Sequence, residues 1–214
     1  MYKVIKRLLD ILLSIFLLII LFPILLICFL AVKIDSPGEA IFKQTRLCKG
    51  GKEFTMYKFR SMYVNSEHTG TGVYSYKGDK RVTKVGNFLR KTSLDELPQL
   101  FNILKGDMRL IGPRPALWNQ DDLVAEREKY GANDVRPGLS GWAQINGRDE
   151  LEIPYKAKLD GEYVRRMGPV FDLRCLFGTV FSVLKSDGVV EGGTGELKKN
   201  ENKRVLILVN LDLT

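Results

Sequence analysis

The sequence predicts a mainly helical α+β protein with an N-terminal re-entrant membrane helix, a small β-hairpin and interfacial amphipathic helices. Three observations lead to this prediction. A long apolar run stands near the N-terminus, two alternating segments follow it, and helix-like segments fill much of the remaining chain. The 214 residues, with 45% hydrophobic and 27% charged side chains, leave room for one folded domain with appended segments.

The apolar run covers residues 11–32 and is interrupted only by Ser14, Pro23 and Cys28. As a helix of about 22 residues it is roughly 33 Å long, enough for a membrane. Lys33-Ile34-Asp35-Ser36-Pro37 offers no small-x-small cleavage site, which disfavours a signal peptide. Pro23 favours a kink, and basic residues flank both ends. These features suit a re-entrant helix, but the residues leave a spanning helix open.

The next element is a predicted β-hairpin. Residues 40–44 and 54–60 alternate apolar and polar side chains, and Lys-Gly-Gly-Lys at 49–52 separates them. Residues 63–80 are polar and contain glycine without any periodicity, so we expect a mobile loop there. The hairpin would therefore be followed by an irregular connection.

Two adjacent carboxylates, Asp95 and Glu96, follow a helical turn at residues 85–89 and the basic residue Arg90. Ser93 and Glu96 have the spacing of a capping box at a helix start, which is a structural explanation for the acids. Taken alone, the pair favours that explanation over a functional one. The motifs elsewhere in the chain reverse this preference.

Beyond the acidic pair, glycine and proline punctuate residues 112–115 and 135–148, and each segment alone is either a site wall or a tight surface turn. Residues 121–130 predict a charged helix. Residues 171–184 predict an apolar helix for the core or the membrane interface. After a Gly- and Lys-rich tail, residues 204–210 form a strand-like run, interpreted as a remnant of a neighbouring reading frame or as an edge strand.

Composition limits the function classes. A net charge of +8 and a pI near 9.3 indicate an anionic partner, which composition alone leaves as nucleic acid, anionic lipid or a phosphorylated substrate. Cys28, Cys48 and Cys175 show no CxxC spacing, so a disulfide framework or zinc site is not indicated, and a reducing, cytosol-facing protein is expected. His68 is the single histidine, which argues against Ser-His-Asp hydrolysis.

Several motifs stand in order along residues 1–186. They are the apolar run with its central proline, Ser36-Pro37-Gly38, Tyr57-Lys58-Phe59-Arg60-Ser61-Met62, Ser93-Leu94-Asp95-Glu96-Leu97-Pro98-Gln99-Leu100, Lys105-Gly106-Asp107-Met108, Gly112-Pro113-Arg114-Pro115, Arg136-Pro137-Gly138 and Gly141-Trp142-Ala143-Gln144-Ile145-Asn146-Gly147-Arg148. Together they resemble the bacterial sugar transferase family, whose members are monotopic phosphoglycosyl transferases. By size the chain is similar to the minimal form. One departure is Phe22-Pro23, where the family's re-entrant helix often has Ser-Pro.

The resemblance implies transfer of a sugar-1-phosphate from a UDP-sugar to a polyprenyl phosphate such as undecaprenyl phosphate, with release of UMP. It places the family's nucleophile at Asp95, with Glu96 beside it, and implies a covalent phosphosugar intermediate on Asp95. A carboxylate attacking a diphosphate needs positive charge, so Mg²⁺ is expected with Asp95 and Glu96 as candidate ligands. The candidate phosphate- and substrate-binding residues are Arg90, Arg114, Arg148, Lys58 and Gln144.

We therefore expect a membrane helix at 1–35 with its kink at Pro23, a catalytic domain at 36–186 and a tail at 187–214. The catalytic domain would lie on the cytoplasmic face of the bacterial inner membrane. The expected partners are a UDP-sugar, polyprenyl phosphate and membrane lipid, without nucleic acid, in a pathway of surface polysaccharide assembly. Two other hypotheses are a membrane-anchored nucleic-acid-binding or scaffold protein and a glycosyltransferase that releases UDP.

Overall fold

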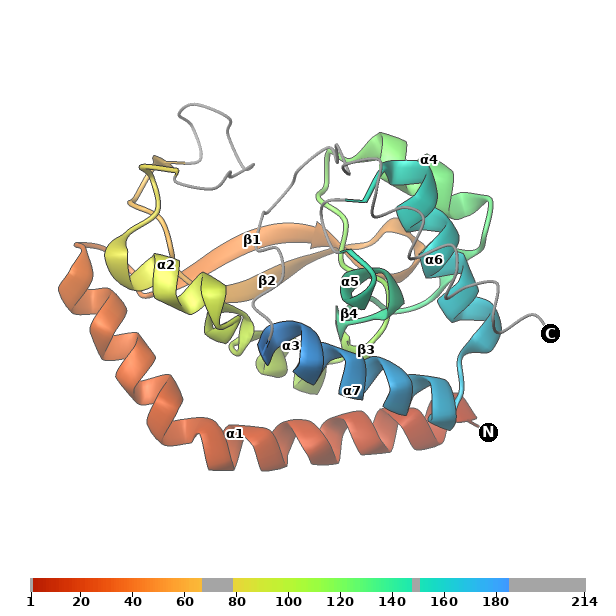
Figure 1. Cartoon of the computed structure of the whole chain (residues 1–214), viewed down its shortest axis with the longest axis horizontal. Coiled ribbons are helices and arrows are strands. Elements are labelled where there is room, and N and C mark those ends of the chain that lie inside the picture. Colours follow the sequence, from red (N-terminus) through yellow and green to blue (C-terminus); the bar gives the residue numbers. More distant parts are fainter. Residues whose placement is uncertain (1, 67–78, 148–150, 185–214) are drawn as a thin grey trace.

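The computed structural model describes residues 2–66, 79–147 and 151–184 (Figure 1). It is mainly helical, as predicted. The helices are α1 (Tyr2–Asp35), α2 (Lys84–Lys91), α3 (Gln99–Lys105), α4 (Asp121–Glu128), α5 (Trp142–Ile145), α6 (Ile153–Arg166) and α7 (Pro169–Leu184). The strands are β1 (Ile41–Leu47), β2 (Glu53–Phe59), β3 (Arg109–Ile111) and β4 (Gly138–Ser140), and the short 3-10 turns are η1 (Lys49–Gly51), η3 (Leu94–Glu96) and η4 (Ala132–Asp134).

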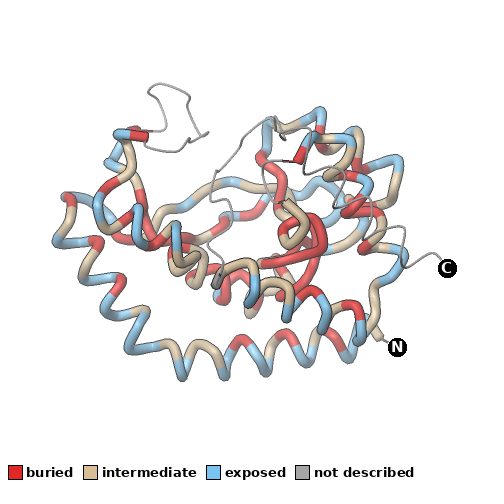
Figure 2. Tube along the Cα trace, in the orientation of Figure 1, coloured by how far each residue is buried: buried red, intermediate tan, exposed pale blue. Residues whose placement is uncertain are grey.

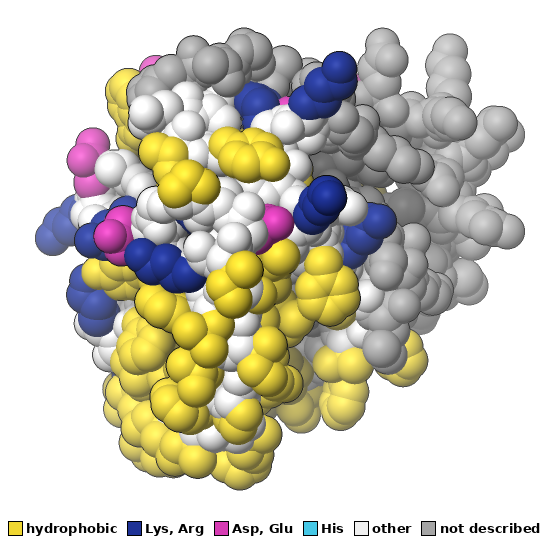
Figure 3. Space-filling view, turned by 90° about the vertical axis from the view of Figure 1, so that its left-hand side faces the viewer, with side chains coloured by type: hydrophobic (Ala, Val, Ile, Leu, Met, Phe, Trp, Pro, Cys, Tyr) yellow, Lys and Arg dark blue, Asp and Glu magenta, His cyan; other side chains and the backbone are white. Residues whose placement is uncertain are grey.

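Helix α1 is longer than the predicted apolar run, because it begins at Tyr2 and continues through Pro23 to Asp35. Figure 1 shows that it bends, so that one arm runs below α7 and the other rises toward α2. In the part of the chain that the structure describes, α1 alone is long and apolar enough to cross a membrane. Most of its large apolar side chains are exposed, and Figure 3 shows hydrophobic side chains gathered over this lower part of the molecule.

The predicted β-hairpin is confirmed. Strands β1 and β2 pair antiparallel with Ile41 opposite Phe59 and Leu47 opposite Glu53. The turn η1 has Gly50 and Gly51 at φ values of 69° and 72°, a left-handed conformation that glycine adopts without steric cost. The Lys-Gly-Gly-Lys segment therefore forms the turn that its composition predicted.

A second sheet was not predicted. Strands β3 and β4 pair in parallel, with Arg109 opposite Gly138 and Ile111 opposite Ser140. A Cβ atom on Gly138 would lie 2.1 Å from the backbone nitrogen of Gly112, and one on Gly141 would lie 2.0 Å from the Gly112 carbonyl oxygen. The two glycine- and proline-containing segments thus pack backbone against backbone, and they are not independent surface turns.

Both ends of α1 contact the folded domain. Near its start, the Lys6 ammonium lies 2.7 Å from a carboxylate oxygen of Asp172 on α7, and Asp10 pairs with Arg109 at 3.3 Å. At its end, the buried Arg60 donates to the Ser36 carbonyl at 2.6 Å and its hydroxyl at 3.0 Å. The same domain therefore holds both arms of the bent helix.

The main core lies where α3, α5, α6 and α7 surround the parallel strands, as the buried segments in Figure 2 show. Ile103, Met108 and Tyr163 are almost fully buried there. The Tyr163 hydroxyl shares its single hydrogen between two acceptors, the Ile111 carbonyl at 3.0 Å and an Asp172 carboxylate oxygen at 2.9 Å, which joins α6, β3 and α7. Burial raises the pKa of Tyr163, so this phenol stays protonated.

Two predicted helices are confirmed as α4 and α7, and the expected turn at 85–89 lies within α2. Helix α6 was not predicted. Most of the expected loop at 63–80 and all of the tail at 187–214, including the strand-like run, lie outside the described residues.

Candidate active site

The acidic pair lies in the 3-10 turn η3, not at the start of an α-helix as predicted. Helix α3 begins only at Gln99, after Pro98. Ser93 has a φ of 55°, and its side chain makes no cap hydrogen bond. The structural alternative, a capping box formed by Ser93 and Glu96, is therefore not observed. A non-glycine residue in the left-handed region is strained, and such strain occurs at functional sites.

Asn102 fixes the position of this turn by joining α3 to β2. Its side chain is fully buried, its oxygen accepts the Tyr57 backbone N–H at 3.0 Å, and its nitrogen donates to the Thr55 carbonyl at 2.7 Å. The Asn102 amide thus binds backbone groups of β2 in the way that a neighbouring strand would. The acidic pair therefore lies next to β2.

Three of the predicted site residues meet at one oxygen atom. Oε1 of Glu96 lies 3.2 Å from the ammonium of Lys58 on β2, and it accepts from the guanidinium of Arg114 at 3.0 Å. All three side chains are largely shielded from solvent. At low exposure such pairs are strengthened and are costly to break from one side. The geometry thus makes Glu96 the common anchor of two cations from distant segments.

Asp95 precedes this anchor in the same turn and is itself only 5% exposed. The turn contacts both α2 and β2. Arg90, on α2, donates from Nε to the Ser61 hydroxyl at 2.8 Å just beyond the end of β2. The segments around the two carboxylates therefore carry basic side chains. They are Arg90 on α2, Lys58 on β2 and Arg114 after β3.

Gln144 and Arg148 are not joined to this group by the described contacts. Gln144 lies on α5, where both polar atoms of its side chain are buried without a hydrogen-bond partner among the described residues. Because buried side-chain amides are normally hydrogen-bonded, Gln144 stays a candidate for contact with a polar ligand. Arg148 lies outside the described residues.

The acidic pair can supply carboxylate oxygens to a divalent cation. Among the described residues there is no group of three or more His, Cys, Asp or Glu side chains that could enclose a metal. Mg²⁺ in phosphoryl-transfer sites is commonly held by only one or two carboxylates together with substrate phosphates and water. The donor set of Asp95 and Glu96 is consistent with that mode.

Sequence reasoning missed the residues that position this site. Arg60 stands inside one of the motifs and Asn102 lies between two of them, but nothing in their local pattern shows which backbone groups they bind. Cys48 is another case, because its thiol donates to the Asp107 carbonyl at 3.0 Å and links the hairpin turn to the end of α3. Burial raises the pKa of Cys48, which argues against a thiolate nucleophile there.

Comparison with known proteins gives evidence, independent of the structure, for the family of the chain. The sequence model described as "Bacterial sugar transferase" matches residues 1–186. The chain is 43% identical to the UDP-glucose:undecaprenyl-phosphate glucose-1-phosphate transferase of Escherichia coli over 84% of the chain and 40% of that relative. It is 40% identical to a UDP-N-acetylgalactosamine-undecaprenyl-phosphate N-acetylgalactosaminephosphotransferase of Aeromonas hydrophila, over 87% of the chain and 45% of that relative.

A shorter relative matches over nearly its whole length. The uncharacterized sugar transferase EpsL of Bacillus subtilis is 41% identical over 87% of the chain and 90% of its own length. The chain thus spans less than half of the two longer relatives but most of this one. The matched part contains every described element of the fold.

Proposed function

The chain belongs to the bacterial sugar transferase family, and we propose that it transfers a sugar-1-phosphate from a UDP-sugar to undecaprenyl phosphate or a similar polyprenyl phosphate, releasing UMP. The names of the two longer relatives supply the substrate class. The observation that carries the proposal is the Glu96 anchor, which gathers Lys58 and Arg114 beside Asp95. This arrangement combines a carboxylate nucleophile with cations suited to phosphate oxygens.

Asp95 is the proposed nucleophile. A carboxylate oxygen forms a bond to the sugar-bearing phosphorus, the bond from that phosphorus to the bridging oxygen breaks, and UMP leaves with the electron pair. A phosphate oxygen of the polyprenyl phosphate then attacks the same phosphorus. The bond to Asp95 breaks, and the free carboxylate returns. Neither displacement requires a proton transfer from Asp95.

Lys58 and Arg114 offset the negative charge of the diphosphate and of the departing UMP. Arginine suits this role because its planar guanidinium can donate two parallel hydrogen bonds to a phosphate. Glu96 holds both cations in position before substrate arrives, so little reorganisation is needed during reaction. In this proposal Glu96 is a positioning residue for the cations as well as a candidate metal ligand.

Mg²⁺ is the proposed cofactor, with Asp95 and Glu96 as the residues that would hold it. When bound, it would neutralise phosphate charge and thereby reduce the repulsion that an anionic nucleophile meets. The protein's own contribution is to keep the two carboxylates adjacent in η3 and to exclude water from Asp95, which is buried.

We also propose that α1 enters and leaves the membrane by the cytoplasmic face. Support comes from its bend, from Pro23 within it, and from the contacts of both its ends with one domain. A straight spanning helix would carry its ends to opposite faces of the bilayer. With both arms held by the domain, the site can meet a soluble nucleotide-sugar and a lipid-embedded phosphate at the inner membrane.

A nucleotide-release screen tests this function. Purified protein in detergent or nanodiscs would be given Mg²⁺, undecaprenyl phosphate and a panel of UDP-sugars, and the released nucleotide would be identified. The proposal predicts UMP from at least one donor. Release of UDP instead would indicate an ordinary glycosyltransferase. No release from any donor, together with salt-sensitive binding of arbitrary duplex DNA, would support the nucleic-acid hypothesis.

A further inference from the structure

We propose that a pocket between the hairpin turn and α4 binds the nucleoside part of the donor, and that the side-chain oxygen of Asn133 recognises uracil there. This inference rests on the proposed function and adds to it a location for the base. The pocket has a volume of about 330 Å³, which lies within the range of about 300–1,000 Å³ typical of small-molecule sites.

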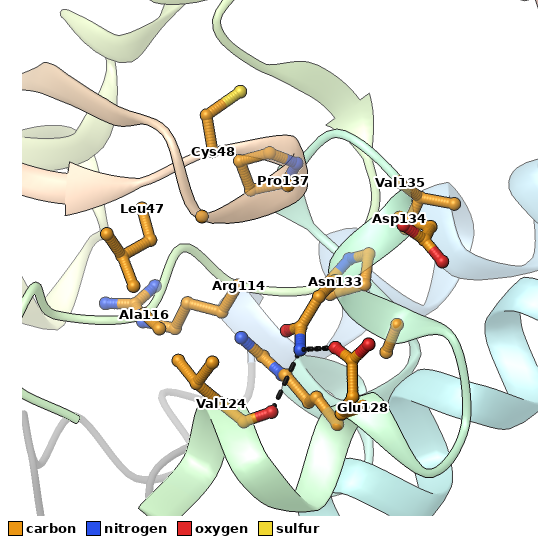
Figure 4. A pocket seen from close by; sticks show the side chains of 15 residues that line it. Leu47, Cys48, Arg114, Ala116, Val124, Glu128, Asn133, Asp134, Val135 and Pro137 are labelled. Atoms are coloured by element: carbon orange, nitrogen blue, oxygen red, sulfur yellow. Dashed lines mark hydrogen bonds between the residues drawn. The ribbon is translucent and has the colours of Figure 1, made fainter. Parts of the chain in front are cut away.

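Residues of η1, α4 and η4 line the pocket together with the end of β1 and the segments that follow β3 and η4 (Figure 4). The turn η1 contributes Gly50 and Gly51, α4 contributes Val124 and Glu128, and η4 contributes Asn133. The glycines present backbone without side chains, so a flat ring can approach closely. Val124 adds an apolar surface. The lining therefore combines a small number of polar groups with apolar contacts, as expected for a nucleoside.

Arg114 connects this pocket to the acidic pair. It lines the pocket, and its guanidinium also donates to Glu96 at 3.0 Å. In Figure 4, Asn133 lies between Arg114 on one side and Glu128 on the other. A nucleoside diphosphate would place its phosphates at the Arg114 end, since the carboxylate of Glu128 repels them from the other. Ribose hydroxyls, in contrast, can donate to a carboxylate.

The other arginine of the pocket does not compete for phosphate. Nε and Nη2 of Arg127 donate to one oxygen of Asp160 at 2.8 and 2.6 Å, and both residues are buried. This ion pair neutralises the guanidinium in the pocket wall. The charge of the pocket therefore differs between its two ends, with Arg114 at one end and the exposed acids Glu128 and Asp134 elsewhere in the lining. This difference fixes the direction in which the nucleotide lies.

The orientation of Asn133 follows from its two hydrogen bonds. Its amide nitrogen donates to the Val124 carbonyl at 2.9 Å and to the Glu128 carboxylate at 2.8 Å, and both partners are pure acceptors. If the amide were flipped, its oxygen would face these two acceptors and could not bond to them. The nitrogen therefore faces them, and the side-chain oxygen is the atom that can bind a ligand. That oxygen can accept a hydrogen bond but cannot donate one.

An acceptor at this place distinguishes the two pyrimidines. Uracil carries a hydrogen on N3 and can donate it to Asn133, whereas N3 of cytosine is an acceptor and would face oxygen with a lone pair. The pocket should therefore bind UDP more tightly than CDP. An isosteric apolar residue at 133 should remove most of this difference.

Calorimetric titration of the full chain with UDP and with CDP tests the inference. Asn133→Leu should weaken UDP binding by about 3- to 10-fold, the range for loss of one neutral hydrogen bond, and should affect CDP less. Val124→Phe fills the pocket and should weaken both nucleotides. Asn87→Leu, the same change at an exposed position on α2, is the matched control and should leave both affinities unchanged. Thermal unfolding would verify that each variant is folded.

The outcomes separate this inference from the proposed function. If folded Asn133→Leu and Val124→Phe bind UDP and CDP as the wild type does, while the enzyme still releases UMP, the nucleoside site lies elsewhere. If the variants change the UDP-to-CDP ratio as described but no UDP-sugar yields UMP, the pocket stands and the proposed reaction fails. Equal wild-type affinity for UDP and CDP would contradict the role of Asn133.

Discussion

Asp95 and Glu96 are neighbours with different surroundings. Glu96 accepts from Lys58 and Arg114 through one oxygen, whereas Asp95 is buried in the turn that precedes it. Two acids in a first helical turn would share one role, that of complementing the helix dipole. The observed turn instead gives them separate positions, which supports separate roles in the proposed reaction.

Substitution of each acid should therefore have a different effect. Asp95→Asn should abolish turnover, because an amide is a poor nucleophile and a poor metal ligand. Glu96→Gln should lower kcat/KM but leave residual activity, since the amide oxygen can still accept from one cation. UMP release by purified variants measures both effects. Substantial turnover by folded Asp95→Asn, with an unfolding temperature close to that of the wild type, would refute its assignment as nucleophile.

Arg114 tests whether guanidinium geometry matters beyond charge. Arg114→Lys keeps the positive charge but loses the planar fork, so kcat/KM for the UDP-sugar should fall by at least about tenfold, one lost charge-assisted hydrogen bond being worth about 1.5–3 kcal/mol. Arg165→Lys, at an exposed position of α6, is the matched control. Wild-type kinetics in Arg114→Lys would show that any cation suffices.

The sequence pattern predicted those helices and strands whose formation depends mainly on neighbouring residues. Alternation and the Lys-Gly-Gly-Lys turn predicted the hairpin, and apolar length predicted α1. Lys6, however, looked like part of a basic flank, and only the tertiary fold shows that it pairs with Asp172. The parallel pairing of β3 and β4 joins short segments far apart in the chain, each too brief for a periodic signal.

Helix α6 shows another limit. It contains Gly161, which lowers helix propensity and obscures the pattern. A Cβ atom at Gly161 would lie 2.4 Å from Cβ of Tyr130, so the glycine allows the segment after α4 to pack closely against α6. Gly161 therefore serves the close contact between α6 and Tyr130, and the neighbouring sequence does not indicate this contact.

The topology of α1 can be tested with single cysteines at Lys3 and Lys52, on a background that lacks the three native cysteines. Both positions should resist an impermeant thiol reagent in intact cells and react after permeabilisation, because both arms of α1 are held by one domain. Labelling of one position alone before permeabilisation would establish a spanning helix.

The largest exposed apolar surface in the described part of the molecule lies on α1 and α7. Besides α1, helix α7 exposes Leu173, Phe177, Val180 and Phe181, and Figure 1 shows it alongside the first arm of α1. Figure 3 shows charged side chains above the hydrophobic region. A surface of this kind fits a protein that lies in the membrane interface with its polar part in water.

A charge placed on this surface should weaken membrane binding. Phe177→Glu puts a carboxylate on the exposed apolar face of α7 that we propose contacts lipid, so less protein should bind vesicles containing anionic lipid in a flotation assay. Ala125→Glu adds the same charge at an exposed position on α4, which Figure 1 shows on the side away from α1, and it serves as control. Equal loss in both variants would mean that net charge, and not the α7 surface, decides binding.

In the proposed reaction Asp95 becomes covalently bound to the sugar-phosphate before the lipid reacts, and a rapid-quench experiment can detect that adduct. Enzyme mixed with the UDP-sugar and Mg²⁺, without polyprenyl phosphate, should release up to about one UMP per active site within seconds. Intact-mass analysis after acid quench should show the added sugar-phosphate on the peptide that contains Asp95. UMP that appears only when lipid is present, with no adduct at the shortest times, would refute the covalent intermediate and indicate a single displacement in which Asp95 acts as metal ligand or base.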